Sequence, residues 1–209
     1  MRPGLAPTRR RVIRKPSARL APRERILAAA RELFYRDGIR AVGVEAIAAC
    51  AGTNKMTLYR HFSSKDALIS AYLNRLSDES DAVWEEARRA EPGNPGAQLR
   101  WLLRRVSQFA DESSGRGCAL ANAAVELAGR RHPACRIVEA QKRRTRERLV
   151  ALCREAGFAH PRELADELFL LVEGARVSLQ SVGPRGPGSR LCALAEALLD
   201  AAPKVNHKV

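Results

Sequence analysis

Apolar residues recur every three or four positions along most of the chain, and no useful length alternates with the two-residue period of a β-strand. The sequence therefore predicts an all-α protein. Its N-terminal part favours three short amphipathic helices, over residues 22–37, 44–51 and 55–61. Pro22 suits the first position of a helix, and Gly38 is expected to end the first of the three.

The same spacing predicts longer helices in the rest of the chain. A helix capped by Ser63 or Ser64 is expected to run toward Ala87, before a break rich in proline and glycine at residues 92–96. The later helices are expected over residues 99–109, 118–128, 133–156, 162–180 and 189–201.

Charge and apolar content divide the chain into three parts. Residues 1–21 carry three prolines, many arginines and almost no apolar residues in register, so we expect a flexible basic arm. Residues 22–68 hold the short helices, and residues 69–209 form a larger helical domain. Residues 1–65 contain 15 Lys and Arg against 4 Asp and Glu, whereas residues 66–209 contain 22 against 19. The positive charge gathers near the N-terminus, where it suits phosphate binding.

The second and third short helices, with the turn between them, have the order of a helix-turn-helix. Gly52 permits a left-handed turn between them. Ile47 supplies the inner face of the helix before the turn, and Leu58 and Phe62 bury the helix after it. That last helix, over residues 55–61, is expected to enter the major groove of DNA.

A family resemblance rests on the residues after this turn, which read L-Y-x-H-F-x-x-K at Leu58, Tyr59, Arg60, His61, Phe62 and Lys65. From Arg23 to about Leu73 the chain resembles the TetR family of bacterial transcription regulators. The resemblance implies an N-terminal three-helix helix-turn-helix domain joined to a larger helical ligand-binding and dimerisation domain. It further implies a homodimeric repressor that binds a palindromic double-stranded DNA operator and is released by a small-molecule effector.

Donor chemistry and the resemblance together predict the DNA contacts. Lys55 and Arg60 can reach guanine edges, and Thr53 and Thr57 can bond phosphate or touch a thymine methyl. The resemblance assigns phosphate contacts to three further residues, Tyr59, His61 and Lys65.

Two residues depart from the common family pattern. Met56 stands where many relatives have glycine, so it is expected to contact a thymine methyl or to alter the approach of the helix. Gly43 stands where a capping Ser or Thr is usual, and its backbone amide is expected to serve a phosphate instead.

The larger domain offers candidate effector-lining residues by position only: Trp84, Trp101, Gln108, Cys118, Asn122, Glu126 and Arg176. Cys118 follows Arg116 and Gly117 at an expected helix start, where a helix dipole and a positive neighbour favour a reactive thiol. Its surroundings resemble a subgroup of the family with members that sense electrophiles or oxidants. The alternatives for Cys118 are therefore a thiol-based sensor and a quiet buried cysteine.

The last two helices are expected to form the dimer interface. Both carry wide apolar faces, with residues Leu164, Leu168, Phe169, Leu171, Val172, Leu179, Leu191, Leu194, Leu198 and Leu199. In the family this pair of helices forms a four-helix interface with its symmetry mate, and Gly174 would allow close approach. Ordinary core packing is the alternative.

Other classes of protein are less consistent with the sequence. The five cysteines form no C-x-x-C pair, which is typical of reduced thiols in a cytoplasmic protein, and no apolar run is long enough to span a membrane. No metal-ligand spacing or phosphate loop supports an all-helical enzyme with an appended helix-turn-helix, and no cofactor is expected. A DNA-coating protein fits poorly with a nearly neutral larger domain. The basic run at residues 142–148 is interpreted as a solvated face.

Overall fold

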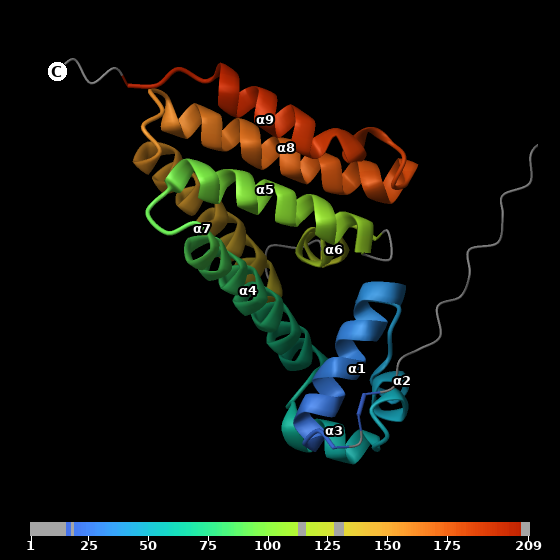
Figure 1. Ribbon diagram of the computed structural model, residues 1–209. Helices are drawn as coiled ribbons and strands as arrows, with labels where there is room; N and C mark the ends of the chain where they lie inside the picture. The colour runs from blue at the N-terminus through green and yellow to red at the C-terminus, as the bar shows by residue number, and fades with distance from the viewer. Residues whose placement is uncertain (1–15, 18, 113–115, 128–131, 206–209) are drawn as a thin grey trace, which may run out of the picture. The chain divides into compact units, whose positions relative to one another are not determined.

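The computed structural model describes residues 16–17, 19–112, 116–127 and 132–205, so most of the expected basic arm lies outside the described residues. The all-α prediction is confirmed: within these ranges the secondary structure is helical apart from an isolated bridge between Phe158 and Lys204 (Figure 1). The helices are α1 (Pro22–Asp37), α2 (Val44–Cys50), α3 (Lys55–His61), α4 (Lys65–Ala90), α5 (Pro95–Glu112), α6 (Ala119–Glu126), α7 (Pro133–Glu155), α8 (Pro161–Val182), a 3₁₀ turn η1 (Pro187–Arg190) and α9 (Leu191–Ala201).

The chain forms two compact units, Met1–Leu68 and Ile69–Val209. In the first unit, α1, α2 and α3 pack around side chains that are fully buried, among them Ile26, Ile47 and Leu58. Gly52 adopts a φ of 63°, a backbone conformation that is unfavourable for residues with a side chain. It therefore allows the tight turn from α2 to α3.

Helix caps explain why α3 and α4 begin where they do. The Asn54 side chain accepts a hydrogen bond of 2.8 Å from the backbone N–H of Thr57, at the start of α3. Ser64 accepts one of 3.0 Å from the N–H of Ala67, at the start of α4. Each bond satisfies an N–H group that the helix itself leaves without a partner, which fixes the entry to both helices.

Two predicted helix starts shift in the structure. Helix α5 begins at Pro95, one turn before the first apolar residue of its pattern, because Asn94 caps it with a bond of 3.0 Å to the N–H of Ala97. Helix α9 begins at Leu191, because the residues just before it form η1 instead. In both cases local capping or turn geometry, rather than apolar spacing, decides the boundary.

In the second unit, α5, α7, α8 and α9 enclose the main apolar core (Figure 1). Leu99, Cys153, Leu168 and Ala195 are fully buried there. Burial raises the pKa of the Cys153 thiol to about 11. No helix in the described part of the chain is both long and apolar enough to cross a lipid bilayer.

The apolar residues of α8 and α9 divide between the core and the surface, so ordinary core packing, the alternative given above, accounts for part of them. Leu164, Leu168, Leu179, Leu191 and Leu199 are buried in the chain's own core. The exposed part consists of Leu170, Val177, Val182 and Leu194, and Gly174 has open space where a Cβ would stand. Apolar spacing alone did not predict which residues are buried and which are exposed, because both faces of α8 carry apolar residues.

Candidate nucleic-acid interface

One side of α3 is buried and the other is open to solvent. Leu58 is fully buried, and Phe62 packs just beyond the end of the helix. The exposed side, here called the reading face, consists of Lys55, Met56, Tyr59 and Arg60. Residues three and four apart share a side of a helix, so these four side chains project together. The reading face therefore presents two cations, a phenol and a thioether on a helix whose opposite side is buried.

Met56 is the most exposed of the large apolar side chains in the described part of the chain, with 80% of its surface accessible. The thioether side chain is flexible and apolar, so exposure to water does not stabilise it. It can instead pack against an apolar group such as a methyl. Its position on the reading face is consistent with the expected contact to a thymine.

Lys55 already has a partner in the protein. Its Nζ lies 2.7 Å from Oε1 of Glu45, near the start of α2. The hydrogen bond with Lys55 lowers the pKa of Glu45, and the same bond raises the pKa of Lys55. A DNA contact by Lys55 therefore exchanges this carboxylate for a base or a phosphate. Glu45 and Lys55 are ten residues apart with a turn between them, so their pairing was not predicted from the sequence.

The other predicted contacts lie around the reading face with different exposure. Gly43 is exposed just before α2, and Thr53 and Thr57 are half-buried at the start of α3. His61 is half-buried too, and its Nε2 atom is enclosed with no hydrogen-bond partner within the described ranges. Lys65 is half-buried at the first position of α4. Thr57 and His61 therefore lie on less exposed sides of α3 than the reading face, and Gly43, Thr53 and Lys65 lie outside the helix.

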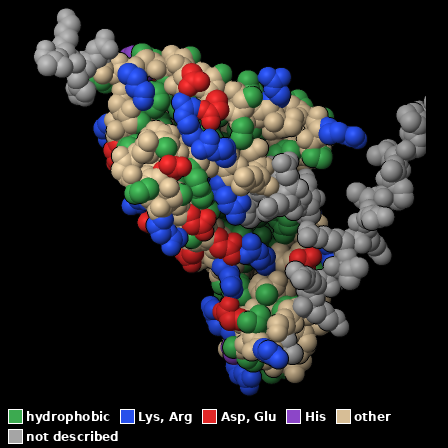
Figure 2. Space-filling model, viewed as in Figure 1, with side chains coloured by type: hydrophobic (Ala, Val, Ile, Leu, Met, Phe, Trp, Pro, Cys, Tyr) green, Lys and Arg blue, Asp and Glu red, His purple; other side chains and the backbone are tan. Residues whose placement is uncertain are grey.

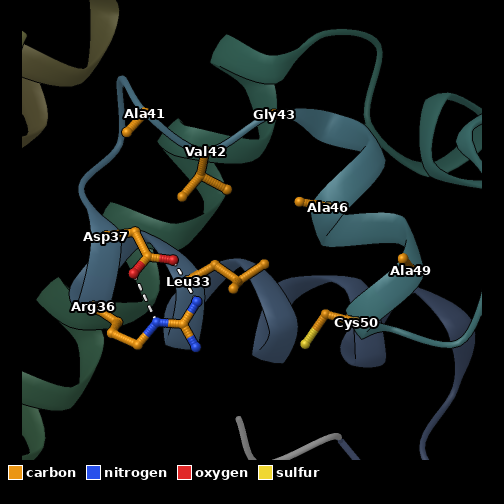
Figure 3. Close-up of a pocket in the computed structure, with 9 residues that line it drawn as sticks. All are labelled: Leu33, Arg36, Asp37, Ala41, Val42, Gly43, Ala46, Ala49 and Cys50. Atoms are coloured by element: carbon orange, nitrogen blue, oxygen red, sulfur yellow. Dashed lines mark hydrogen bonds and ion pairs between the residues drawn. The ribbon is translucent and has the colours of Figure 1, made fainter. Parts of the chain in front are cut away.

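A pocket of about 450 Å³ opens between α1, α2 and the loop that joins them (Figure 3). Arg36 and Asp37 stand at one wall, where Arg36 Nε donates to Asp37 at 2.7 Å. The remaining lining is mostly small and apolar: Leu33, Ala41, Val42, Gly43, Ala46, Ala49 and Cys50. Of the predicted DNA contacts only Gly43 borders this pocket, so the reading face and the pocket are separate features.

The predicted effector residues do not form a single group. Trp84 and Trp101 pack against the main core, with the Arg148 guanidinium 5.8 Å from the Trp84 ring. Gln108 is exposed, and Glu126 is half-buried at the end of α6. These four residues therefore mark the edge of the core and the surface rather than one site.

Cys118 and Arg176 are linked through two residues that were not predicted as site residues, Lys142 and Glu173, whereas Asn122 lies one turn after Cys118 with its side chain on the carbonyl of Arg116. Lys142 Nζ lies 3.8 Å from Cys118 Sγ and 2.6 Å from Glu173 Oε2. Arg176 contacts the same Glu173 at 3.0 Å. The side chain of Lys142 is only 22% exposed, so this member of the basic run is not a solvated charge.

Among the described residues, no three His, Cys, Asp or Glu side chains are placed to hold a metal ion.

Comparisons with known proteins agree with this architecture. Residues 26–72 match the model of the bacterial regulatory proteins, tetR family. The chain is 31% identical to SCO4454, a TetR-family transcriptional regulator from Streptomyces coelicolor; the likeness covers 86% of this chain and 94% of that one, with a TM-score of 0.81.

Curated relatives are similar over a shorter region. UidR, an HTH-type transcriptional regulator of Escherichia coli, is 32% identical over 111 residues, which are 53% of each chain. FasR, an HTH-type transcriptional activator of Mycolicibacterium smegmatis, is 40% identical over 92 residues, 44% of this chain and 42% of FasR. The chain thus spans about half the length of these relatives. With a helix-turn-helix in its N-terminal part and a likeness to a TetR-family structure over 86% of its length, the chain belongs to the TetR family of bacterial transcriptional regulators.

Proposed function

We propose that the protein is a homodimeric repressor that binds a palindromic operator and leaves it when a small-molecule effector binds. The observation that carries the proposal is the reading face, whose donors stand free of the core on a capped and buried helix. A recognition helix needs this combination, because specificity depends on side chains held in one geometry against base edges.

The side chains of the reading face have different tasks. Arg60 forms no ion pair with any residue in the described part of the chain, so its guanidinium is available for a bidentate bond to guanine. Lys55 serves as a second base-reading donor once it leaves Glu45. The phosphates on either side are held by six groups, namely Tyr59, His61, Lys65, Thr53, Thr57 and the Gly43 amide. Met56 covers a thymine methyl.

Dimerisation supplies a second copy of the reading face. Leu170, Gly174 and Val177 share one side of α8, and Leu194 is exposed on α9; these four residues are the apolar strip proposed to pair. A second copy related by two-fold symmetry can pack the same strip against this one, and a palindrome then matches the symmetry of the protein. Replacing Gly174 with leucine fills the point of closest approach, so we expect weaker dimerisation by sedimentation. An unchanged dimer in that variant would rule out this interface.

A thiol-based sensor on the same scaffold is the second candidate, because of the surroundings of Cys118. Its thiol is half-buried rather than enclosed and lies beside the amine of Lys142. A cysteine with a purely structural role does not require an amine beside its thiol. In this version of the function, chemical modification of Cys118 replaces the non-covalent effector as the signal that releases DNA.

Selection of binding sites from random duplex DNA tests the proposal directly. We expect enrichment of a palindrome whose half-sites lie about one helical turn, or a multiple of it, apart. Footprinting on the enriched site should then show a discrete protected region. Failure to enrich any sequence, or continuous protection along the duplex, would favour a DNA-coating protein instead.

A further inference from the structure

The carboxylate of Glu45 lies beside the start of α3, although the residue belongs to α2. Its Oε1 atom is 2.7 Å from Nζ of Lys55, the first residue of α3. Both side chains are more than half exposed, so the protein does not enclose either group. The N-terminal residues of a recognition helix contact base edges. A helix that brings Lys55 to a base therefore brings a negative charge to the same place.

The two oxygens of this carboxylate have different neighbours. Oε1 accepts the hydrogen bond from Lys55, whereas Oε2 lies next to Gly43, where an added Cβ would stand 3.4 Å from it. Because Gly43 has no side chain, that side of the carboxylate is left uncovered by this residue. The Lys55 ammonium also lies 6.0 Å from the centre of the Tyr59 ring, on the reading face. The carboxylate thus adjoins the reading face without being one of its donors.

DNA binding removes the cation that pairs with Glu45. If Lys55 turns to a guanine, as in the proposed function, the carboxylate loses this partner while the DNA excludes water from it. A carboxylate that is removed from water without a hydrogen-bond donor is strongly destabilising. The phosphates of the duplex carry the same sign of charge and add repulsion. A donor on the DNA must therefore replace Lys55 if the complex is to be tight.

Few groups in the major groove can supply that donor. A carboxylate accepts hydrogen bonds and donates none. Guanine presents the acceptors N7 and O6, thymine presents the acceptor O4, and the donors are the amino groups of cytosine and adenine. In a G·C pair, the cytosine amino group bonds to O6 of guanine, so it lies next to a guanine that Lys55 contacts. Amino groups of bases are thus the partners that suit Glu45.

We infer that Glu45 is a specificity-determining residue, which favours operators with an amino group of cytosine or adenine beside the base that Lys55 contacts. At other sequences the carboxylate faces acceptors and lowers the affinity. Glu45 therefore weakens binding to DNA in general and weakens it least at the operator, so it discriminates by repulsion as well as by attraction. This inference rests on the proposed function, because it requires that α3 reads DNA.

Selection of binding sites from random duplex DNA, with the parent and with Glu45→Ala, is the first test. In the parent, one position of each half-site should favour cytosine or adenine on one strand by about ten-fold, the size of one base-edge contact. Glu45→Ala should weaken this preference several-fold and keep the preferences at the other positions. Asp166→Asn is the matched control, because it removes a carboxylate from an exposed ion pair on α8. It should keep every preference.

Deletion of the amino group from the operator separates recognition from net charge. The affinity of each protein is measured on the selected operator and on a duplex with purine in place of that adenine, or 2-pyrimidinone in place of that cytosine. Loss of one negative charge raises the affinity for both duplexes alike, so the ratio of the two affinities is the readout. We expect a ratio of about ten in the parent and close to one in Glu45→Ala. Glu45→Gln should give an intermediate ratio, because its amide oxygen still accepts a hydrogen bond.

Two results would overturn the inference and leave the proposed function intact. One is a selected motif in Glu45→Ala with the same preference as the parent at every position. The other is an equal ratio in the parent and in Glu45→Ala on the amino-deleted duplex, with a uniform gain in affinity, which would place Glu45 beside a phosphate. If the parent enriches no sequence at all, the proposed function fails and the inference fails with it.

Discussion

The reading face of α3 carries two cations and the basic run of α7, residues 142–148, carries five, and the two regions present them differently. In α7 the cations pair with carboxylates of the same unit, namely Lys142 with Glu173, Arg143 with Glu139, Arg144 and Arg148 with Asp81, and Arg146 with Asp166. On α3, Arg60 has no such partner in the described part of the chain. Acidic and basic side chains intermingle on the face of the larger unit seen in Figure 2. Positive residues in the sequence are thus a poor guide to a DNA surface unless the carboxylates beside them are counted.

The largest expected effect concerns the packing that holds the reading face. Leu58→Ala removes a fully buried side chain behind α3 and leaves a cavity, which costs about 2–5 kcal/mol of unfolding free energy in the first unit. Chemical denaturation, followed by a probe in that unit, measures the loss. Leu170→Ala, on the exposed side of α8, is the control and should leave this transition unchanged. A stable Leu58→Ala variant would mean that α3 is not supported as described.

A smaller effect is expected at the cap of α3. Asn54→Ala removes the acceptor for the Thr57 N–H, with a cost of about 1 kcal/mol. Asn54→Ser keeps an acceptor and should recover most of the stability in the same denaturation experiment. Equal losses in both variants would show that the cap contributes through something other than this hydrogen bond.

The smallest effect concerns the pair that occupies Lys55. Glu45→Gln removes a carboxylate that competes with DNA, so operator affinity should rise by a few-fold at low salt. Asp166→Asn removes a carboxylate from a similar exposed pair on α8, with Arg146 of α7, and should leave operator affinity unchanged. A rise in both variants would indicate a general effect of net charge rather than release of Lys55.

The same pairs predict a weak dependence of stability on pH. Hydrogen bonds with Lys55 and Arg146 lower the pKa values of Glu45 and Asp166 in the folded state. Their contribution is therefore complete above the unfolded pKa values, about 4, and is lost as pH falls through the lowered folded values. Both pairs are exposed, so the loss should be small and should vanish in high salt. Thermal unfolding between pH 3 and 6, in the parent and in Glu45→Gln, measures it.

Local signals in the sequence account for most of the fold. Apolar spacing, Gly52 and the proline and glycine breaks are features of neighbouring residues, and they predicted the helices to within a few positions. The pairing of Glu45 with Lys55 depends instead on the turn geometry between two helices. Lys142 looked solvated because its sequence neighbours are charged, yet packing of α8 against α7 half-buries it.

Buried polar residues were the least predictable part. Gln141 is almost fully buried, and its Oε1 accepts hydrogen bonds from Ser77 at 2.7 Å and Arg144 at 2.6 Å. Ser77 belongs to α4 and the other two residues to α7, so only tertiary packing brings them together. A glutamine beside a basic run carries no sign of burial in the sequence, because Ser77, the partner from another helix, is distant in the chain.

The most direct test of the account compares Arg60→Ala with Arg143→Ala on the selected operator. Both variants remove one arginine, but Arg60 stands on the reading face and Arg143 is paired with Glu139 on α7. We expect Arg60→Ala to lose about 1–3 kcal/mol of binding free energy and to relax the preference at one base pair, with Arg143→Ala close to the parent. Equal losses in the two variants, with no change in base preference, would contradict the claim that α3 reads the DNA.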